Sequence, residues 1–257
     1  MTAVFWCFLP LFGLAVGSFL NVIIVRMPGD ESILRPPSKC PQCESEIKGR
    51  DNIPVVSWLL LRGKCRSCGE PIPVGYPLVE LANTALWVAA GVRFGPHAVL
   101  VPFLFLFSVL LAQSVIDLEL YILLDKITFP ALAISVPLLA AVAFTGHDPK
   151  AAIIGAAAAS IGYFVFLGLP AVIYPKGMGL GDVKLALLMG LYLGFIHPVL
   201  ALFSVILACL LGIVAGGVLY FARGRKSQNF PFGPWLALGC VLAILFSAQI
   251  LHPYGYT

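Results

Sequence analysis

Long apolar runs separated by short polar breaks make up most of the sequence. Eight runs are predicted to span a membrane, with bounds good to a few residues: 3–25, 77–94, 97–116, 127–145, 151–173, 183–197, 198–222 and 234–252. Except for the short sixth run, each has about the 17–25 residues that a helix needs to cross a bilayer. A backbone that faces lipid must satisfy its polar groups within its own segment, so these runs are predicted to be helices. Small residues at 155–160 and 212–217 favour close helix packing there. The pattern predicts an all-α polytopic membrane protein with about eight transmembrane helices.

The composition supports this fold class. Charged residues make up only 11% of the chain and hydrophobic residues 60%, whereas a soluble domain has about 25% charged residues. Lipid is therefore expected to be most of the protein's solvent, which excludes a cytosolic enzyme, a secreted disulfide scaffold and a disordered segment. The first run is expected to be a retained helix and not a signal peptide. No Lys or Arg precedes Arg26, and the run is longer than a signal core.

Half of the charged residues lie in one stretch. Fourteen of the 28 charges fall between Arg26 and Tyr76, so residues 26–76 are predicted to form the main aqueous module. With eight spans, 14 of the 16 Lys and Arg residues fall on one side of the membrane, leaving Arg93 and Lys150 on the other. The positive-inside rule places the first side in the cytoplasm and both termini outside. The predicted domains are a first transmembrane helix (1–25), a cytoplasmic four-cysteine domain (26–76) and a seven-helix membrane domain (77–257).

Four of the seven cysteines form two Cys-x-x-Cys pairs. Cys40 and Cys43 make the first pair, and Cys65 and Cys68 make the second after a gap of 21 residues. Two such pairs at this separation are typical of a four-thiolate zinc site, with Gly69 allowing the tight backbone behind the second pair. A thiol–disulfide relay is the alternative, but a reducing compartment and two pairs in one module favour structural zinc. The other cysteines are predicted to be small buried hydrophobic residues: Cys7, Cys209 and Cys240.

Six acids lie outside this module: Glu80, Asp117, Glu119, Asp125, Asp148 and Asp182. Asp148 is predicted to be a turn residue on the outer side. Glu80 lies near the start of the second run, where a carboxylate is costly unless it is paired or faces water. The residues alone leave two interpretations of Glu80 open: it anchors a helix end, or it lines a ligand pocket.

The remaining acids lie at one membrane boundary. The segment from Asp117 to Asp125 closes the third run and opens the fourth, and Asp182 opens the sixth run on the same predicted side. Three alternating glycines precede Asp182, which would permit positive φ angles and the close approach of a substrate backbone: Gly177, Gly179 and Gly181. The alternative is an ordinary loop with an aspartate at a helix cap.

Two carboxylates at one depth suggest acid–base chemistry. Repulsion between them lets the pair keep one proton, so that the ionised partner activates water and the protonated partner binds a peptide carbonyl. That is the chemistry of an aspartic protease. The histidines are expected on or near the outer side, which separates any histidine-based catalysis from these acids: His97, His147, His197 and His252.

The order of these motifs matches a known family. They are Gly17 to Pro28, the four-cysteine loop, Gly75 to Glu80, Ile116-Asp117 with Asp125, and Gly179-Leu-Gly181-Asp182-Val-Lys184. Together they resemble the bacterial type IV prepilin peptidases, of the GxGD aspartic protease group. The resemblance covers nearly the whole chain. Leu123-Leu124-Asp125 stands where the family usually has Leu-Pro-Asp, and Glu119 stands where an Asp is common.

The resemblance implies a multi-pass enzyme of the bacterial inner membrane. It would cut the basic leader from prepilins and from pseudopilins of type II secretion, and then methylate the new N-terminal amine with S-adenosylmethionine. It implies membrane lipid as a partner and no nucleic acid. It assigns Asp117 and Asp182 as the catalytic pair, with support from a further set: Gly179, Gly181, Asp125 and Lys184. Asp125 is the alternative first acid, which the residues alone do not exclude. In the family, the cysteine loop is associated with metal binding and with the methylating forms.

The methyl donor has no recognisable site in the sequence. No glycine-rich loop between a strand and a helix is predicted, so S-adenosylmethionine rests on the resemblance alone. The region of the cysteine loop and Glu80 is the expected place. Two other functions fit part of the pattern. A transporter or channel could use the carboxylates to bind cations, although no mirrored set lies in the opposite half, and a zinc-bearing scaffold would bind partners without turnover.

Overall fold

The computed structural model describes residues 2–146, 148–174, 179–223 and 230–254. The chain divides into two compact units, Met1–Pro96 and His97–Thr257. The described residues are mostly helical and contain two isolated β-bridges in place of strands, which confirms the all-α prediction. His147 and Gly177 lie outside the described ranges, as do three of the 14 basic residues counted on the predicted cytoplasmic side: Lys176, Arg225 and Lys226. The predicted division at residues 25/26 and 76/77 stays a prediction.

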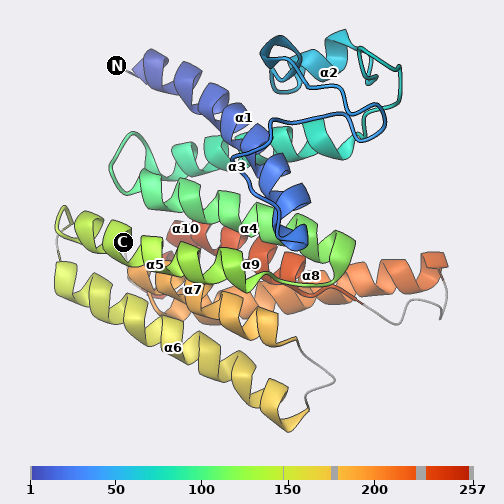
Figure 1. Cartoon of the computed structure of the whole chain (residues 1–257). Coiled ribbons are helices and arrows are strands. Elements are labelled where there is room, and N and C mark those ends of the chain that lie inside the picture. Colours follow the sequence, from blue (N-terminus) through green and yellow to red (C-terminus); the bar gives the residue numbers. More distant parts are fainter. Residues whose placement is uncertain (1, 147, 175–178, 224–229, 255–257) are drawn as a thin grey trace. The chain divides into compact units, whose positions relative to one another are not determined.

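The first unit is built on two long helices. They are α1 (Thr2–Arg26) and α3 (Gly75–Phe94), which lie side by side in Figure 1. The chain between them contains the turns η1 (Met27–Gly29) and η2 (Gly49–Asp51) and the short helix α2 (Val56–Leu60).

A glycine and two asparagine side chains set the register of α1 against α3. A Cβ added at Gly17 would lie 2.7 Å from the Cα of Glu80, so only glycine allows this approach. The Asn83 Nδ2 donates to the carbonyl of Gly13 at 2.8 Å, and the Asn21 Nδ2 donates to the carbonyl of Tyr76 at 3.1 Å. Amide side chains bonded between apolar helices fix an antiparallel pair in which Asn21 is level with the beginning of α3.

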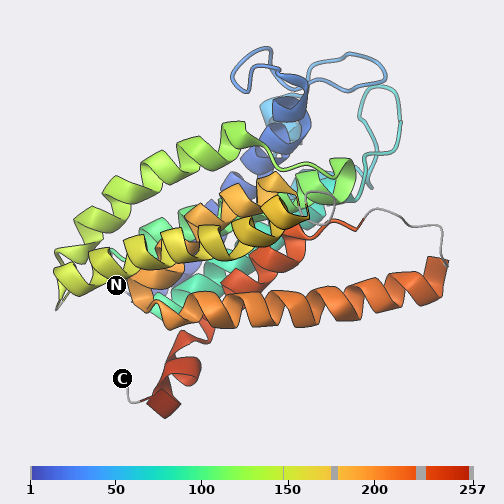
Figure 2. The same cartoon turned by 90° about the horizontal axis from the view of Figure 1, so that it is seen from below.

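The second unit contains the remaining helices: α4 (Leu100–Leu120), α5 (Asp125–Ala143), α6 (Pro149–Ile173), α7 (Leu180–Ile196), α8 (Val199–Arg223), α9 (Gly233–Leu245), α10 (Ser247–Leu251) and the turn η4 (His252–Tyr254). Helix α7 packs against α5, α6, α8 and α9, and Figure 2 shows α6 running along it. Leu185, Leu188 and Leu193 of α7 are fully buried. A helix that is apolar on every side belongs inside a protein, which agrees with the position of α7 among these four helices.

Small residues bring α6 and α7 together, as the sequence predicts for 155–160. A Cβ at Gly190 would lie 2.6 Å from the carbonyl of Ala159, and a Cβ at Gly194 would overlap the backbone of Gly155. The Ser160 hydroxyl adds a 2.7 Å hydrogen bond to the carbonyl of Leu187. At 212–217 the packing is looser: a Cβ at Gly212 would lie 3.4 Å from the ring of Phe232 and a Cβ at Gly216 3.8 Å from the ring of Phe230. A Cβ at Gly217 would have no described neighbour within 4 Å outside the nearby backbone of its own helix.

Five helices among the described residues are long and apolar enough to cross a bilayer: Ala3–Gly29, Leu100–Leu120, Asp125–Ala143, Pro149–Ile173 and Val199–Val218. The other three predicted runs correspond to α3, α7 and α9, so the number of eight spans stays a prediction. The eighth run, predicted as 234–252, is not one helix. Helix α9 ends at Leu245, and α10 begins at Ser247 after a break at Phe246.

Candidate active site and cysteine cluster

Asp117 lies in the last turn of α4, inside the second unit. The side chain is buried, with the residue 6% exposed. Helix α4 ends because Tyr121 takes a left-handed conformation, with φ at 58° and its N–H bonded to the Asp117 carbonyl. The backbone N–H of Gly233, at the beginning of α9, donates to Asp117 Oδ2 at 3.1 Å. A residue 116 positions away along the chain thus holds this carboxylate.

Asp182 lies in the first turn of α7, with the residue 8% exposed. Its Oδ1 atom is buried and has no hydrogen-bond partner among the described residues. The helix begins three residues earlier than predicted, with Gly179 at the N-cap and no side-chain cap bond. The aspartate is therefore not an ordinary capping residue. The positive φ angles that the glycines would permit are not used at Gly179, whose φ is −70°, or at Gly181, which is not among the described residues with positive φ.

Asp117 and Asp182 are linked through shared neighbours. Leu123 is a common neighbour of both ends of the site, since a Cβ at Gly181 would lie 2.9 Å from its Cβ and a Cβ at Gly233 3.3 Å from its Cδ2. A Cβ at Gly233 would also lie 2.7 Å from Asp117 Oδ2. The absence of a side chain at Gly181 and Gly233 therefore lets Leu123 and Asp117 lie close to the backbone of this site.

Gln113 is a residue of the site region that the sequence analysis missed. It is fully buried in α4, and its side chain bonds both backbone groups of Leu124, at 3.1 Å to the N–H and 3.0 Å to the carbonyl. It also bonds Thr128 Oγ1 at 2.7 Å. The side chain thereby fixes the connection that contains Leu123. A lone amide in an apolar run was the available signal, because buried polar groups in membranes need partners.

Asp125 and Lys184 pair with each other at the surface. Lys184 Nζ lies 2.6 Å from Asp125 Oδ2, and the two side chains are 35% and 48% exposed. The ammonium also lies 5.8 Å from the ring centre of Phe129. The pair joins the beginning of α5 to the beginning of α7. Asp125 differs from Asp117 in being exposed and already neutralised by a cation.

Glu80 is a buried carboxylate of the first unit, 7% exposed. Its Oε2 accepts a 2.7 Å hydrogen bond from the N–H of Val55, directly before α2, and its side chain also bonds Ser18. Of the two interpretations left open by the sequence, this geometry favours the anchor. A role of Glu80 in cofactor binding stays a prediction.

The sulfurs of Cys40, Cys43, Cys65 and Cys68 converge on one point. All four lie within 4.8 Å of one another, and the Cys40 and Cys68 sulfurs are 3.8 Å apart. Tetrahedral zinc with bonds of about 2.3 Å requires sulfurs about 3.8 Å apart. The four residues therefore fit a metal ion of this kind, and the cluster could hold one.

The two halves of the cluster repeat the same backbone geometry. Cys40 N–H bonds the carbonyl of Ser45, and Cys65 N–H bonds that of Glu70. The left-handed position behind each pair is filled by Glu44, with φ at 54°, and by Gly69, with φ at 75°. The predicted role of Gly69 is thus matched by the structure, and a non-glycine residue takes the same strained position in the first half.

Hydrogen bonds favour the thiolate at two of the four cysteines, while desolvation and the neighbouring sulfurs raise the pKa of the Cys68 thiol to about 12. The Ser45 hydroxyl lies 2.9 Å from the Cys43 sulfur, and its bonds with Cys43 lower the pKa of that thiol to about 6. Backbone N–H groups of Cys68 and Ser67 lower the pKa of Cys65. Metals bind the thiolate form of cysteine, so Cys43 and Cys65 are the two sulfurs that the folded loop favours as ligands.

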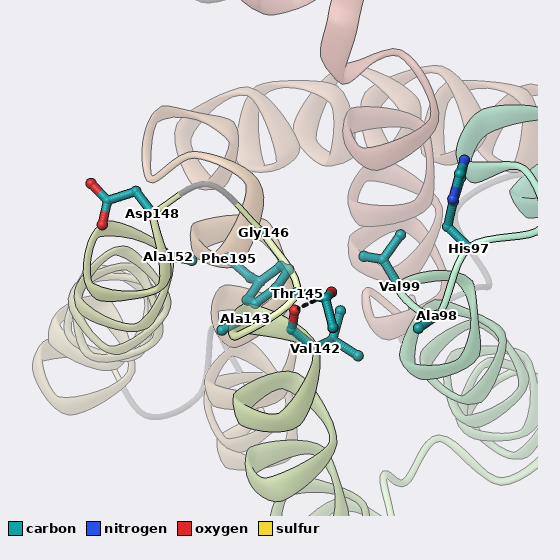
Figure 3. Close-up of a pocket in the computed structure, with 10 residues that line it drawn as sticks. All are labelled: His97, Ala98, Val99, Val142, Ala143, Thr145, Gly146, Asp148, Ala152 and Phe195. Carbon is teal, nitrogen blue, oxygen red and sulfur yellow. Dashed lines mark hydrogen bonds between the residues drawn. The ribbon is translucent and has the colours of Figure 1, made fainter.

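A separate cavity lies in the second unit, at the ends of α4 and α7 that are opposite to the two aspartates. It has a volume of about 520 Å³, and Figure 3 shows His97, Thr145 and Asp148 among the residues that line it. It lies at the beginning of α4 and the end of α7, whereas Asp117 and Asp182 lie at the opposite ends. Asp148 is the N-cap of α6, accepting from Ala151 N–H at 3.0 Å, so it is a cap and not simply a turn residue.

Family models match both units. A bacterial peptidase A24 N-terminal domain matches residues 11–94, and the type IV leader peptidase family matches residues 104–219. The chain is 35% identical to the prepilin leader peptidase/N-methyltransferase of Aeromonas hydrophila, across 95% of this chain and 91% of that protein. The chain belongs to the type IV leader peptidase family. Each family match falls within one compact unit, with the cysteine cluster in the first and both buried aspartates in the second.

Other relatives agree with this membership. The protein of the same name from Bacillus subtilis is 36% identical, with 95% of each chain covered. That from Myxococcus xanthus is 40% identical across 88% of this chain and 66% of its own length. No solved structure gives a significant match. The resemblance found in the sequence is confirmed, and the transporter alternative is not favoured.

Proposed function

We propose that the chain is a membrane-embedded aspartic endopeptidase that removes the leader of prepilins and pseudopilins and then N-methylates the new terminus. The observation that supports the peptidase most directly is that two buried carboxylates, Asp117 and Asp182, come from helices distant in sequence and have Leu123 as a common neighbour of their adjoining glycines. The relatives' shared name, prepilin leader peptidase/N-methyltransferase, supports the substrate and the second activity.

The two carboxylates divide the work of hydrolysis. The ionised one takes a proton from water, which attacks the scissile carbonyl, while the protonated one hydrogen-bonds the carbonyl oxygen. Collapse of the tetrahedral intermediate then needs a proton on the leaving amine, which the pair supplies. Asp117 Oδ2 already accepts a hydrogen bond from Gly233 N–H. Asp182 Oδ1 has no hydrogen-bond partner among the described residues, so it can bind water or substrate.

The site is also suited to a substrate backbone. The Leu123 side chain lies close to both Gly181 and Gly233 and is the apolar group between them. The Gln113 side chain holds the backbone of Leu124, the next residue, by two hydrogen bonds. Preorganised groups cost little reorganisation during the reaction. We place this site, with Gly179, Asp125 and Lys184 in support, at the cytoplasmic boundary of the inner membrane, with both termini on the outer side.

The first test is incubation of the purified protein, in nanodiscs, with a prepilin. Intact-mass measurement should show the loss of the leader, and the mature peptide should carry one added methyl group only when S-adenosylmethionine is present. An unchanged prepilin mass would contradict the peptidase. A transporter would instead show ion flux without a new N-terminal amine.

The two activities should separate. An already cut pilin peptide should be methylated at the wild-type rate by an Asp182→Asn variant, because the buried aspartates act only in hydrolysis. Mass spectrometry of the peptide N-terminus measures the methyl transfer. A variant that folds but methylates as slowly as it cleaves would show that the two reactions share Asp182.

The region of Glu80 and the cysteine loop stays our proposed place for S-adenosylmethionine.

We further propose that Cys40, Cys43, Cys65 and Cys68 bind structural zinc. Four protein thiolates leave no open position on a tetrahedral ion, so the metal would stabilise the loop and take no part in the reaction. Chelation should release one zinc per chain and expose residues 27–74 to limited proteolysis, since metal binding is part of the folding free energy of such loops. Metal content should fall in Cys40→Ser and stay at the wild-type level in the matched control Cys209→Ser. Equal metal content in both variants would contradict the site.

A further inference from the structure

The short helix α2 presents apolar side chains outward. Val56, Leu59 and Leu60 are 46%, 61% and 77% exposed in the whole chain. The opposite side of α2 packs inward, because Trp58 Nε1 donates to the carbonyl of Ile72 at 3.1 Å and Ser57 is buried. The exposed residues are therefore not a loose end. They form one outward surface, defined here as the α2 surface.

One hydrogen bond and one close backbone contact link α2, through Glu80 of α3, to the apolar part of α1. The N–H of Val55, immediately before α2, bonds Glu80 Oε2 at 2.7 Å. The backbone of Glu80 packs on Gly17, which lies nine residues before the end of α1 at Arg26. At 1.5 Å per residue, that is about 13 Å inside the end of the helix.

That part of α1 belongs to a membrane span. Ala3–Gly29 is a candidate span by length and hydropathy, and Phe19 and Val25 on its outer surface are 45% and 59% exposed. Because Glu80 ties α2 to this stretch, α2 cannot stand far out in water. Its leucines lie at the depth where α1 already exposes apolar side chains to lipid.

Charge next to α2 completes the pattern of an interfacial segment. Arg62 and Lys64 follow the helix directly and are exposed, while Arg66 is already paired with Asp51 at 2.7 Å. A segment that combines apolar side chains with adjacent cations lies in the boundary between headgroups and acyl chains. Cations at that level attract anionic headgroups.

We propose that the α2 surface is seated in the lipid leaflet, with Leu59 and Leu60 among the upper acyl chains and Arg62 and Lys64 at anionic headgroups. This seat would fix the cysteine cluster against the membrane, because Gly63 and Ile72, which flank the second cysteine pair, contact Trp58 of α2. The partner is lipid and not a second protein, since the depth set by Glu80 is that of a span.

Photocrosslinking in the intact protein tests this seat. p-Benzoylphenylalanine is placed at Leu60, and in a matched control at Glu70, an exposed position of the same module. The protein is irradiated in nanodiscs of phosphatidylethanolamine and phosphatidylglycerol and analysed by intact mass. We expect lipid adducts at Leu60 at a yield several-fold above that at Glu70. Wild-type zinc content in both variants would show that the module has folded.

Three results would overturn the proposal. Equal lipid adducts at the two positions would show that the α2 surface has no special contact with the leaflet. The absence of an adduct at Leu60 would show that water covers it. Adducts to an added prepilin or to a second copy of the chain, in place of lipid, would make the surface a protein-docking site. None of these outcomes depends on peptidase activity.

Discussion

Replacing either Asp117 or Asp182 by asparagine will reduce leader cleavage by about 10³-fold or more, as the loss of one member of a catalytic unit does. Asparagine keeps the size of the side chain and can still accept the Gly233 hydrogen bond seen at Asp117. It can neither take a proton from water nor supply one to the leaving amine. Single-turnover cleavage of a prepilin, followed by mass spectrometry, measures the loss.

The matched control is Glu119→Gln. Glu119 lies two residues from Asp117 and is exposed, so its substitution should leave the cleavage rate within a few-fold of wild type. Asp125→Asn tests the alternative first acid. If Asp125→Asn abolished cleavage and Asp117→Asn did not, the catalytic pair would be misassigned.

Gly233→Ala is expected to lower kcat by about 10²-fold, the effect of misplacing a reacting group by about 1 Å. The added Cβ would lie 2.7 Å from Asp117 Oδ2 and 3.3 Å from Leu123 Cδ2, so the carboxylate or the beginning of α9 must move. The change lies within the site, so KM should change much less than kcat. Steady-state kinetics on a prepilin peptide separates the two constants.

Gly217→Ala is the control for this substitution. It places the same methyl group in α8, where no described atom outside the nearby backbone of the same helix lies within 4 Å of the added Cβ. Alanine is favoured over glycine in a helix by about 1 kcal/mol, so this variant should be as active as wild type and no less stable. A Gly233→Ala enzyme with unchanged kcat would show that the position of Asp117 does not depend on Gly233.

The sequence predicted the elements that depend on local patterns. Apolar runs located α1, α6 and α8 within a few residues, because lipid and protein both demand apolar side chains over a whole helix. The cysteine spacing predicted a converging cluster, since each Cys-x-x-Cys turn is local and the two turns repeat one geometry. The break between α9 and α10 was missed because Phe246 continues the apolar pattern without a Pro or Gly to mark it.

The arrangement around the aspartates was only partly predictable. The alternation of the predicted spans placed Asp117 and Asp182 at the same membrane boundary, and the family resemblance singled them out. The contact of Gly233 with Asp117 joins residues 116 positions apart, and no local pattern indicates it. The glycines before Asp182 suggested positive φ, but the structure uses Gly181 for close approach to Leu123. The sequence shows that position 181 is a glycine, whereas the contact with Leu123 that requires a glycine there is seen only in the packing.

The most direct measurement for the paired-aspartate mechanism is the cleavage rate of the Asp117→Asn, Asp182→Asn double variant beside the two single variants. Groups that act as one unit lose their whole contribution when either is removed. The mechanism therefore predicts that the double variant cleaves a prepilin no more slowly than either single variant. Stepwise losses that multiply in the double variant would show two independent contributions and would contradict a shared site.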